Sequence, residues 1–411
     1  MQPVARCRRR RFCMVQVGHN PAMGNTATTD SELRVQNPAT GETVRSISTC
    51  TSDEVRDRIE RARAAQAKWS QLSYRERSVP IRRFHDLLLD SANSVLDTLQ
   101  GETGRSRRDC FTELTVIAGT ARYYLNHGEP FIRGRKASPT LPLVTRAETV
   151  RKPRGVVGFI TPWNYPMLLS IGESIAALLA GNAVIIKPSE TTPLSALLGR
   201  QMLIESGLDE DLIQVVAGDA ASLGEAIIDE VDYLHFTGST NTGKIVAAAA
   251  ANRLLPFSLE MGGKNPMLVL EGAHVDRAVQ GLVNGGFTNS GQTCISIERA
   301  YVHDSIFDEF AEKIAGRAER TSVEWSRSWA TDMGSLISER HADSVRSHIR
   351  DAENGGAKII AGGASDELGP AFVRPTVMTG VTSESRFATE EAFGPAIALY
   401  RFDDEQEAVT R

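Results

Sequence analysis

Five short runs of strand-forming residues alternate with helical stretches between residues 156 and 260, and this alternation limits the possible folds more than any other feature. The runs are Val156–Ile160, Ala183–Lys187, Ile213–Val216, Tyr233–Thr237 and Ser258–Glu260. Strands separated by helices favour a mostly parallel sheet with helices on both faces. Ligands of such sheets bind beyond the carboxyl ends of the strands, so functional residues are expected directly after the runs.

Polar and glycine-bearing segments do follow the runs. They are Thr161–Pro166, Lys187–Glu190, Gly238–Gly243 and Glu260–Gly263. Asn164 lies between two prolines on a rigid loop, where its amide either stabilises the loop or donates to a developing oxyanion. The third segment leads into a helix over Ile245–Ala251, whose first N–H groups suit a diphosphate. Because the usual dinucleotide and P-loop spacings are missing, that signal is weak by itself.

Two side chains with catalytic chemistry occur at and beyond the last run. Cys294 ends Gly291-Gln292-Thr293-Cys294, after a glycine-bearing turn and ahead of a strand expected from Arg299. A lone cysteine is more often a small core residue than a nucleophile. Glu260 ends a strand, and the two glycines of Met261-Gly262-Gly263-Lys264 let the backbone pass close to another group. An isolated glutamate of this kind is more often a helix cap or a surface ion pair.

Composition favours a globular enzyme with a small-molecule substrate. The 411 residues are 41% hydrophobic and carry a net charge of −5, which excludes a nucleic-acid or membrane-surface footprint for most of the chain. Five widely spaced cysteines predict free thiols in a reducing compartment, and therefore a cytoplasmic location. No apolar run approaches the roughly 20 residues of a membrane helix. No H-E-x-x-H or C-x-x-C motif predicts a metal.

The N-terminal part has its own local signals. An amphipathic helix is expected behind Thr51, and a second begins with the capping box Ser73–Glu76 and is expected to continue until Gly101. Gly134–Thr149 is polar and proline-bearing, which predicts an extended arm or a hairpin with a bridging role. Residues 1–29 hold no acid and a cluster of arginines, which favours a misassigned start codon over an organellar presequence.

Taken together, these segments resemble the aldehyde dehydrogenase superfamily from about Asn37 to the end of the chain. The segments that carry the resemblance are Leu259–Lys264, Gly291–Cys294, Pro162–Pro166, Lys187–Glu190, Phe236–Ser239 and Glu391–Pro395. The first two are similar to the family's glutamate and cysteine signatures, in the family's order and spacing. The resemblance implies an α/β fold with a doubly wound parallel-sheet cofactor domain, an α/β catalytic domain and a small bridging arm.

The resemblance also implies domain boundaries. Residues 30–133 and 150–260 would form the NAD(P)-binding domain, 134–149 the arm and 261–411 the catalytic domain. Members of the family usually continue several tens of residues past Glu-x-Phe-Gly-Pro, so the catalytic domain is expected to be truncated at Arg411. A homo-oligomer is the norm of the family, and such a truncation argues against its assembly.

The mechanism that the resemblance implies is oxidation of an aldehyde to a carboxylic acid. Cys294 attacks the carbonyl as a thiolate, and the Asn164 side chain and the Cys294 backbone N–H hold the oxyanion. Hydride passes to NAD(P), and Glu260 deprotonates the water that hydrolyses the thioester. The presence of that base separates this chain from the CoA-acylating branch.

The cofactor contacts implied by the resemblance come from several segments. They are Trp163, Lys187, Glu190, Gly218, Gly224, Phe236, Thr237, Gly238, Ser239, Glu391 and Phe393. The Glu190 carboxylate would accept hydrogen bonds from the adenosine ribose but repel a 2′-phosphate, so NAD is predicted to be preferred over NADP. Lys187 softens this repulsion and leaves use of both cofactors open.

The substrate stays open at this stage. Cys294–Arg299 and Asp332–Ser338 look most like the succinate-semialdehyde dehydrogenase branch, with Arg299 as one candidate anchor for the substrate carboxylate. A broad-range aliphatic or aromatic aldehyde is equally defensible. One different function is a non-catalytic, truncated remnant that binds nucleotide or a partner subunit. Another is a cysteine hydrolase, for which His303 is the one histidine near Cys294 in sequence.

Overall fold

The computed structural model of the chain describes residues 32–141, 144–365 and 367–411, so the predictions for residues 1–29 lie outside the described residues. The chain first forms an antiparallel pair of strands, β1 (Glu32–Gln36) and β2 (Thr43–Ser48). Helix α1 (Ser52–Trp69) begins at the Thr51 cap and α2 (Tyr74–Asp90) at the Ser73–Glu76 capping box, as predicted.

The predicted end of the second helical stretch is wrong. Helix α2 ends at Asp90, and a separate helix, α3 (Ala92–Thr103), contains Gly101 in its last turn. The helix ends at Gly104, whose φ of 71° is the left-handed conformation that closes a helix. Glycine at position 101 takes no such conformation, so it does not terminate the helix.

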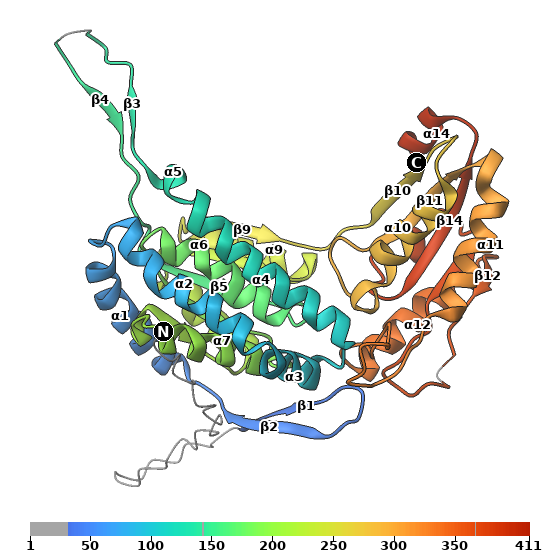
Figure 1. Cartoon of the computed structure of the whole chain (residues 1–411), viewed down its shortest axis with the longest axis horizontal. Coiled ribbons are helices and arrows are strands. Elements are labelled where there is room, and N and C mark those ends of the chain that lie inside the picture. The colour runs from blue at the N-terminus through green and yellow to red at the C-terminus, as the bar shows by residue number, and fades with distance from the viewer. Residues whose placement is uncertain (1–31, 142–143, 366) are drawn as a thin grey trace, which may run out of the picture. The chain divides into compact units, whose positions relative to one another are not determined.

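The chain contains two large sheets (Figure 1). The first is a five-stranded parallel sheet in the order β7-β6-β5-β8-β9. Its strands are β5 (Val156–Ile160), β6 (Ala183–Lys187), β7 (Ile213–Val215), β8 (Tyr233–Thr237) and β9 (Phe257–Glu260). All five predicted runs are therefore confirmed to within one residue at each end. The parallel order confirms the doubly wound arrangement.

Helices cover both faces of this sheet. They are α1, α4 (Arg107–His127), α6 (Glu173–Leu179), α7 (Pro193–Glu205), α8 (Ala220–Glu230) and α9 (Thr240–Asn252), with the π-helix η1 (Leu168–Gly172) before α6 and the 3₁₀ turn η2 (Glu210–Leu212) before β7. Side chains alternate along β5: Val157 and Phe159 face the side of α4 and α6, and Gly158 lies against Ile227 of α8. One hydrophobic core runs through both layers.

The second large sheet has the order β10-β11-β14-β13-β12, in which only β12 runs antiparallel to its neighbour. Its strands are β10 (Asn265–Val269), β11 (Ile297–His303), β12 (Lys358–Ala361), β13 (Thr376–Thr379) and β14 (Ala396–Phe402). Its helices are α10 (Val275–Phe287), α11 (Asp304–Arg320), α12 (Glu339–Asn354), α13 (Arg386–Thr389) and α14 (Glu405–Thr410). Its core clusters contain none of the residues of the first core.

The segment after α5 (Glu129–Ile132) forms a hairpin of β3 (Arg135–Ala137) and β4 (Ala147–Thr149), with Arg135 opposite Thr149. The hairpin form of the arm is thus confirmed, whereas its bridging role and the domain boundaries stay predictions. In the three described ranges, no helix combines the length and apolar character needed to cross a bilayer.

Candidate active site

A cavity of about 260 Å³ is lined by predicted site residues from distant segments of the sequence. Of the predicted site residues, its walls contain Trp163, Asn164, Thr237, Gly238, Ser239, Glu260, Cys294, Glu391 and Phe393. The loops after β5, β8 and β9 contribute to it from the first sheet. These are carboxyl ends of parallel strands, where ligands of such sheets bind. The Gly238 N–H donates to the backbone oxygen of Glu260 at 3.0 Å, which joins the ends of β8 and β9.

The other predicted cofactor residues lie outside this cavity. Lys187 is buried at the end of β6, and its Nζ lies 2.8 Å from a carboxylate oxygen of Glu190. Phe236 is a core residue whose ring packs under Gly238, where an added Cβ would lie 2.7 Å from the ring. Gly218 follows β7 with a φ of 148°, and Gly224 lies in α8.

The loop before Cys294 has a strained backbone. Asn289 and Ser290, in the 3₁₀ turn η3 (Thr288–Gly291), both have a φ of 55°, a conformation that non-glycine residues rarely adopt. Asn289 is held there because its N–H donates to Asp109 at 3.0 Å and its oxygen accepts from the Gln292 side chain at 3.1 Å. Such strain persists only where the surroundings hold it, and it is typical of functional loops.

Gly291 allows the cysteine loop to touch the segment that follows Glu391. A Cβ at Gly291 would lie 2.1 Å from the backbone oxygen of Gly394, so only glycine fits this contact. On the far side of Cys294, the Asn265 side chain donates to the Cys294 oxygen at 2.8 Å. Contacts on both sides of Cys294 therefore fix the backbone that carries the thiol.

The electrostatics of the cavity favour a protonated thiol in the resting protein. Burial raises the pKa of Cys294, and the negative charges of Glu391 and Glu260 raise it further, against hydrogen bonds from backbone N–H groups that lower it. Because this pKa is raised, a nucleophilic role of Cys294 requires loss of the thiol proton. The residue as a whole is exposed.

The side chain of Asn164 spans the space between two loops. Its Nδ2 donates to the Gln292 oxygen at 3.1 Å, and its Oδ1 is buried without a hydrogen-bond donor. An amide nitrogen has two hydrogens, so the second stays available to a ligand oxygen. Tyr165, the next residue, contacts Thr293 through hydroxyl groups 3.1 Å apart.

Glu391 closes the cavity next to the glycines after Glu260. Its carboxylate accepts the Gly263 N–H at 3.2 Å, and a Cβ at Gly262 would lie 2.0 Å from its other oxygen. Burial raises the pKa of Glu391. Buried Glu298 accepts the Phe393 N–H at 3.0 Å, which holds the rest of this segment.

Several cavity residues were not predicted from the sequence. They are Pro162, Leu169, Met261, Gly262 and His341. His341 Nε2 lies 2.8 Å from the Phe393 oxygen, and its ring contacts Trp163 with centroids 5.3 Å apart. Burial lowers the pKa of His341, which favours the neutral ring with Nε2–H as donor. No local motif marks this histidine, because it reaches the cavity only through the packing of α12.

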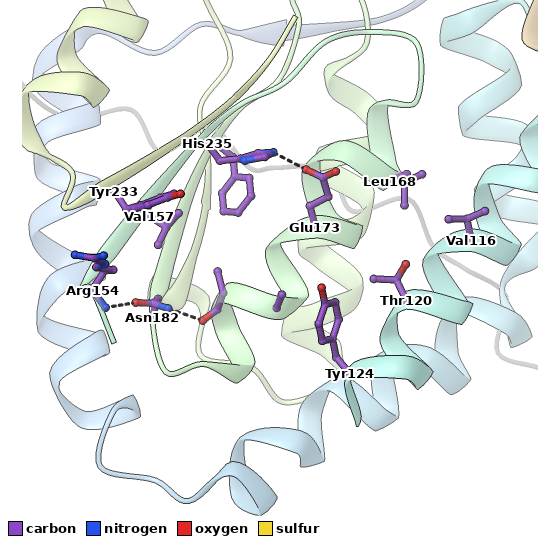
Figure 2. A pocket seen from close by; sticks show the side chains of 13 residues that line it. Val116, Thr120, Tyr124, Arg154, Val157, Leu168, Glu173, Asn182, Tyr233 and His235 are labelled. Carbon is purple, nitrogen blue, oxygen red and sulfur yellow. Dashed lines mark hydrogen bonds and ion pairs between the residues drawn. The ribbon is translucent and has the colours of Figure 1, made fainter. Parts of the chain in front are cut away.

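A larger hollow, of about 630 Å³, lies on the α4 and α6 side of the first sheet and contains none of the predicted site residues (Figure 2). Figure 2 shows an ion pair in this hollow between His235 and Glu173, with Nε2 and a carboxylate oxygen 2.8 Å apart. The combination of thiol, carboxylate and amide therefore belongs to the smaller cavity.

Comparison with known proteins agrees with this geometry. The model of the Aldehyde dehydrogenase family matches residues 25–411. The chain is 41% identical over 373 residues to a putative succinate-semialdehyde dehydrogenase [NADP(+)] of Mycolicibacterium smegmatis, covering 90% of this chain and 72% of the relative. It is 35% identical to the mitochondrial succinate-semialdehyde dehydrogenase of Oryza sativa subsp. japonica, covering 92% and 72%.

Solved structures give the same result. The succinate-semialdehyde dehydrogenase of Burkholderia pseudomallei superposes with a TM-score of 0.90 at 34% identity, over 94% of this chain and 80% of that one. Betaine aldehyde dehydrogenase of Staphylococcus aureus, in complex with NAD+, superposes with a TM-score of 0.87 at 30% identity, over 92% and 76%.

Proposed function

Because this chain belongs to the aldehyde dehydrogenase family, we propose that Cys294, Asn164 and Glu260 carry out its NAD(P)-dependent oxidation of an aldehyde. The observation that supports this assignment is that one cavity brings together a thiol, an amide with a free N–H and a carboxylate. These three groups meet the needs of the reaction, namely a nucleophile, an oxyanion donor and a base for water.

Cys294 forms the bond to the substrate. Its thiolate attacks the aldehyde carbon, and the carbonyl oxygen becomes an oxyanion that the Asn164 N–H and the Cys294 backbone N–H stabilise. One such donor contributes about 3–4 kcal/mol to the transition state of related acyl transfers. NAD(P), when bound, would supply the hydride acceptor, and loss of hydride from the substrate carbon would leave a thioester on Cys294.

Glu260 completes the reaction as the base for hydrolysis. It takes a proton from water, the resulting hydroxide adds to the thioester carbon, and the carboxylic acid leaves as the Cys294 sulfur is released. The position of Glu260 at the end of β9, on the wall of the same cavity, supports this role.

The residues present fit a dinucleotide cofactor. Ser239, directly after Gly238, caps helix α9, which has no acidic residue in its first turn, so the N–H groups and the dipole of the helix suit a diphosphate. Trp163, Glu391 and Phe393 on the cavity wall would hold the nicotinamide end. Gly218, Gly224, Phe236 and Thr237 would shape the adenine and diphosphate side.

For the choice of cofactor we propose NAD over NADP. The Glu190 carboxylate is paired with Lys187 and would accept hydrogen bonds from a ribose hydroxyl, whereas it would repel a 2′-phosphate. The M. smegmatis relative is named for NADP, so this proposal makes the present chain differ from that relative.

We propose succinate semialdehyde as the first substrate to test, because both curated relatives described above are named for it. The predicted carboxylate anchor, Arg299, is engaged elsewhere, since its Nε and Nη2 donate to the Lys264 oxygen at 3.1 and 2.6 Å. No lysine or arginine lines the cavity in the described part of the chain. Butanal, a neutral aldehyde of the same chain length, is therefore the matched comparison.

We also retain a cytoplasmic location as a proposal. The described cysteines Cys50, Cys110 and Cys294 are all free, which is usual for proteins of a reducing compartment. The β3–β4 hairpin is an element that could join subunits. Size-exclusion chromatography with light scattering measures the assembly directly.

The experiment that tests the function follows NADH absorbance with the purified chain, NAD and either succinate semialdehyde or butanal. We expect NADH formation that is lost in Cys294→Ala, and the ratio of the two rates ranks the substrates. A folded chain that binds NAD but forms no NADH with any aldehyde would instead be a non-catalytic remnant.

A further inference from the structure

Three buried charged residues lie at and just before the start of helix α4. Arg105 lies directly before the helix cap, and Asp109 and Glu113, four residues apart, share one side of the helix. Their exposed fractions are 1%, 6% and 0%. Charged groups buried to this extent need specific partners, and the partners here belong to the two loops that carry Asn164 and Cys294.

Glu113 binds the loop that follows Asn164. One carboxylate oxygen accepts the N–H groups of Met167 and Leu168 at 2.8 and 2.9 Å. These are N–H groups at the start of η1 that have no partner within the helix. The other oxygen of Glu113 accepts from the Arg105 guanidinium.

Arg105 binds the same loop from its other end. Its Nη1 donates to the Asn164 backbone oxygen at 3.1 Å, and its guanidinium lies 5.3 Å from the centre of the Tyr165 ring. Its Nε donates to Thr103 at 3.1 Å, which ties the side chain to α3. The ion pair therefore clamps the loop at Asn164 and at Met167–Leu168.

The two loops of the site meet at the oxygen that Arg105 holds. The Asn289 side chain donates to the same Asn164 oxygen at 3.1 Å and to the Gln292 oxygen at 3.0 Å. The Asn164 side chain also donates to the Gln292 oxygen. A shift of the Asn164 backbone would consequently move its amide relative to the loop of Cys294.

Stability alone is a weak reason for such a pair. Burial acts to lower the pKa of Arg105, and the Glu113 carboxylate outweighs this and raises it, so the guanidinium stays charged. Desolvation of two buried charges commonly cancels their attraction, and apolar residues of similar volume often serve stability as well. An apolar pair could not make the hydrogen bonds to the loop of Asn164, so it could not maintain the geometry of that loop.

We propose that Arg105 and Glu113 are positioning residues that hold Asn164 where its amide meets the oxyanion on Cys294. The inference rests on the proposed function, because the pair acts on the reaction only through Asn164. Asn164 touches the reacting atoms, whereas Arg105 and Glu113 touch only the loop that carries it.

A double-mutant cycle tests the proposal. The rate of NADH formation in the first turnover, at saturating NAD and aldehyde, is measured for the wild type, Glu113→Gln, Asn164→Ala and the double variant. We expect Glu113→Gln to slow this rate ~100-fold, as for a reacting group displaced by about 1 Å. In the Asn164→Ala background the same change should cost less than ~2-fold, because the donor that Glu113 positions is already absent.

Glu102→Gln is the matched control. Glu102 is also fully buried, but its carboxylate accepts the N–H groups of Leu194 and Ser195 at the start of α7, and its described hydrogen bonds do not reach the Asn164 loop. We expect this variant to keep the wild-type first-turnover rate. Unchanged NAD affinity in Glu113→Gln, measured by fluorescence titration, would show that the cofactor side is intact.

The outcomes separate this inference from the proposed function. Equal slowing by Glu113→Gln with and without Asn164 overturns the positioning role, as does a Glu113→Gln variant with the wild-type rate. A wild type that forms no NADH, or a rate that Asn164→Ala leaves unchanged, overturns the proposed function itself. If Glu113→Gln does not fold, Arg105→Lys takes its place in the cycle, because lysine keeps the charge but cannot bind Glu113, Thr103 and Asn164 at once.

Discussion

Lys187 and Glu190 form an ion pair of 2.8 Å in which the lysine is buried and the carboxylate is partly exposed. The pair lies at the end of β6, at the carboxyl edge of the parallel sheet. This edge is where the adenosine ribose of a dinucleotide binds in doubly wound folds. In the proposed cofactor site, the charge of Glu190 would therefore face the ribose position that distinguishes NAD from NADP.

Glu190→Gln should relax the choice of cofactor. Without the carboxylate, Lys187 is free to attract a 2′-phosphate, so we expect kcat/KM with NADP to rise by about tenfold, equivalent to about 1.4 kcal/mol. Activity with NAD should change less than about threefold. Steady-state kinetics with both cofactors measure the effect, with the exposed Glu205→Gln on α7 as control. A wild type that already prefers NADP would contradict the proposal.

The pKa of Cys294 should determine the pH dependence of thiol modification. Burial, then Glu391 and Glu260, raise this pKa, so alkylation by iodoacetamide should have its midpoint above the value of about 8.5 of a free cysteine. Glu391→Gln removes a negative charge, which should lower the midpoint and speed alkylation near neutral pH. Mass spectrometry of the Cys294 peptide gives the rate at each pH.

Cys110 provides an internal reference in the same samples. Burial raises the pKa of its thiol to about 12, so its peptide should stay unmodified at every pH tested. A Cys294 midpoint below that of a free thiol, or a higher midpoint in Glu391→Gln, would show that the electrostatics of the cavity are not as described.

Glu260→Gln should separate the two halves of the reaction. Attack and hydride transfer do not use the base, so the first turnover should keep its rate within a few-fold. Hydrolysis does use it, and the steady state should fall by about 10²–10⁴-fold. Stopped-flow absorbance should then show about one NADH per active site followed by a stall. A first turnover slowed as much as the steady state would mean that Glu260 acts before the thioester forms.

The sequence predicted the sheet and most of the cavity because both depend on local signals. Each strand of the first sheet is a short run of strand-forming residues, four of the five runs are directly followed by a polar or glycine-bearing segment, and parallel strands bring those ends to one edge. The order and spacing of the Glu260 and Cys294 segments carried the family resemblance, which places both residues in one site. These features can be seen without knowledge of long-range packing.

The residues that were missed depend on that packing. His341 reaches the cavity only because α12 lies against the segment containing Phe393, 52 residues further along the chain. Arg105 and Glu113 look like ordinary helix charges in sequence, and their burial follows from contacts with a loop more than 50 residues away. The early helix end at Gly101 was wrong because glycine alone does not reveal which position adopts a positive φ.

Glu102 should make the stability of the protein depend on pH in an identifiable way. Burial raises its pKa to about 8, against the hydrogen bonds from Ser195 and Leu194 that lower it. In the unfolded chain a glutamate has a pKa of about 4.3. Because the folded-state pKa is the higher of the two, the stability contributed by protonated Glu102 is fully present below about pH 4.3 and is lost as the pH rises to about 8.

Comparison with Glu102→Gln isolates this contribution, since glutamine has nearly the same shape and does not titrate. We expect the free energy of unfolding of the wild type, relative to the variant, to fall by up to about 1.4 kcal/mol per pH unit between about pH 4.5 and 8, and then to level off. Urea unfolding followed by tryptophan fluorescence at several pH values measures the difference. A difference that is constant, or that grows in favour of the wild type as the pH rises, would mean that Glu102 is ionised inside the folded protein. Its three hydrogen bonds would then outweigh the cost of burying the charge.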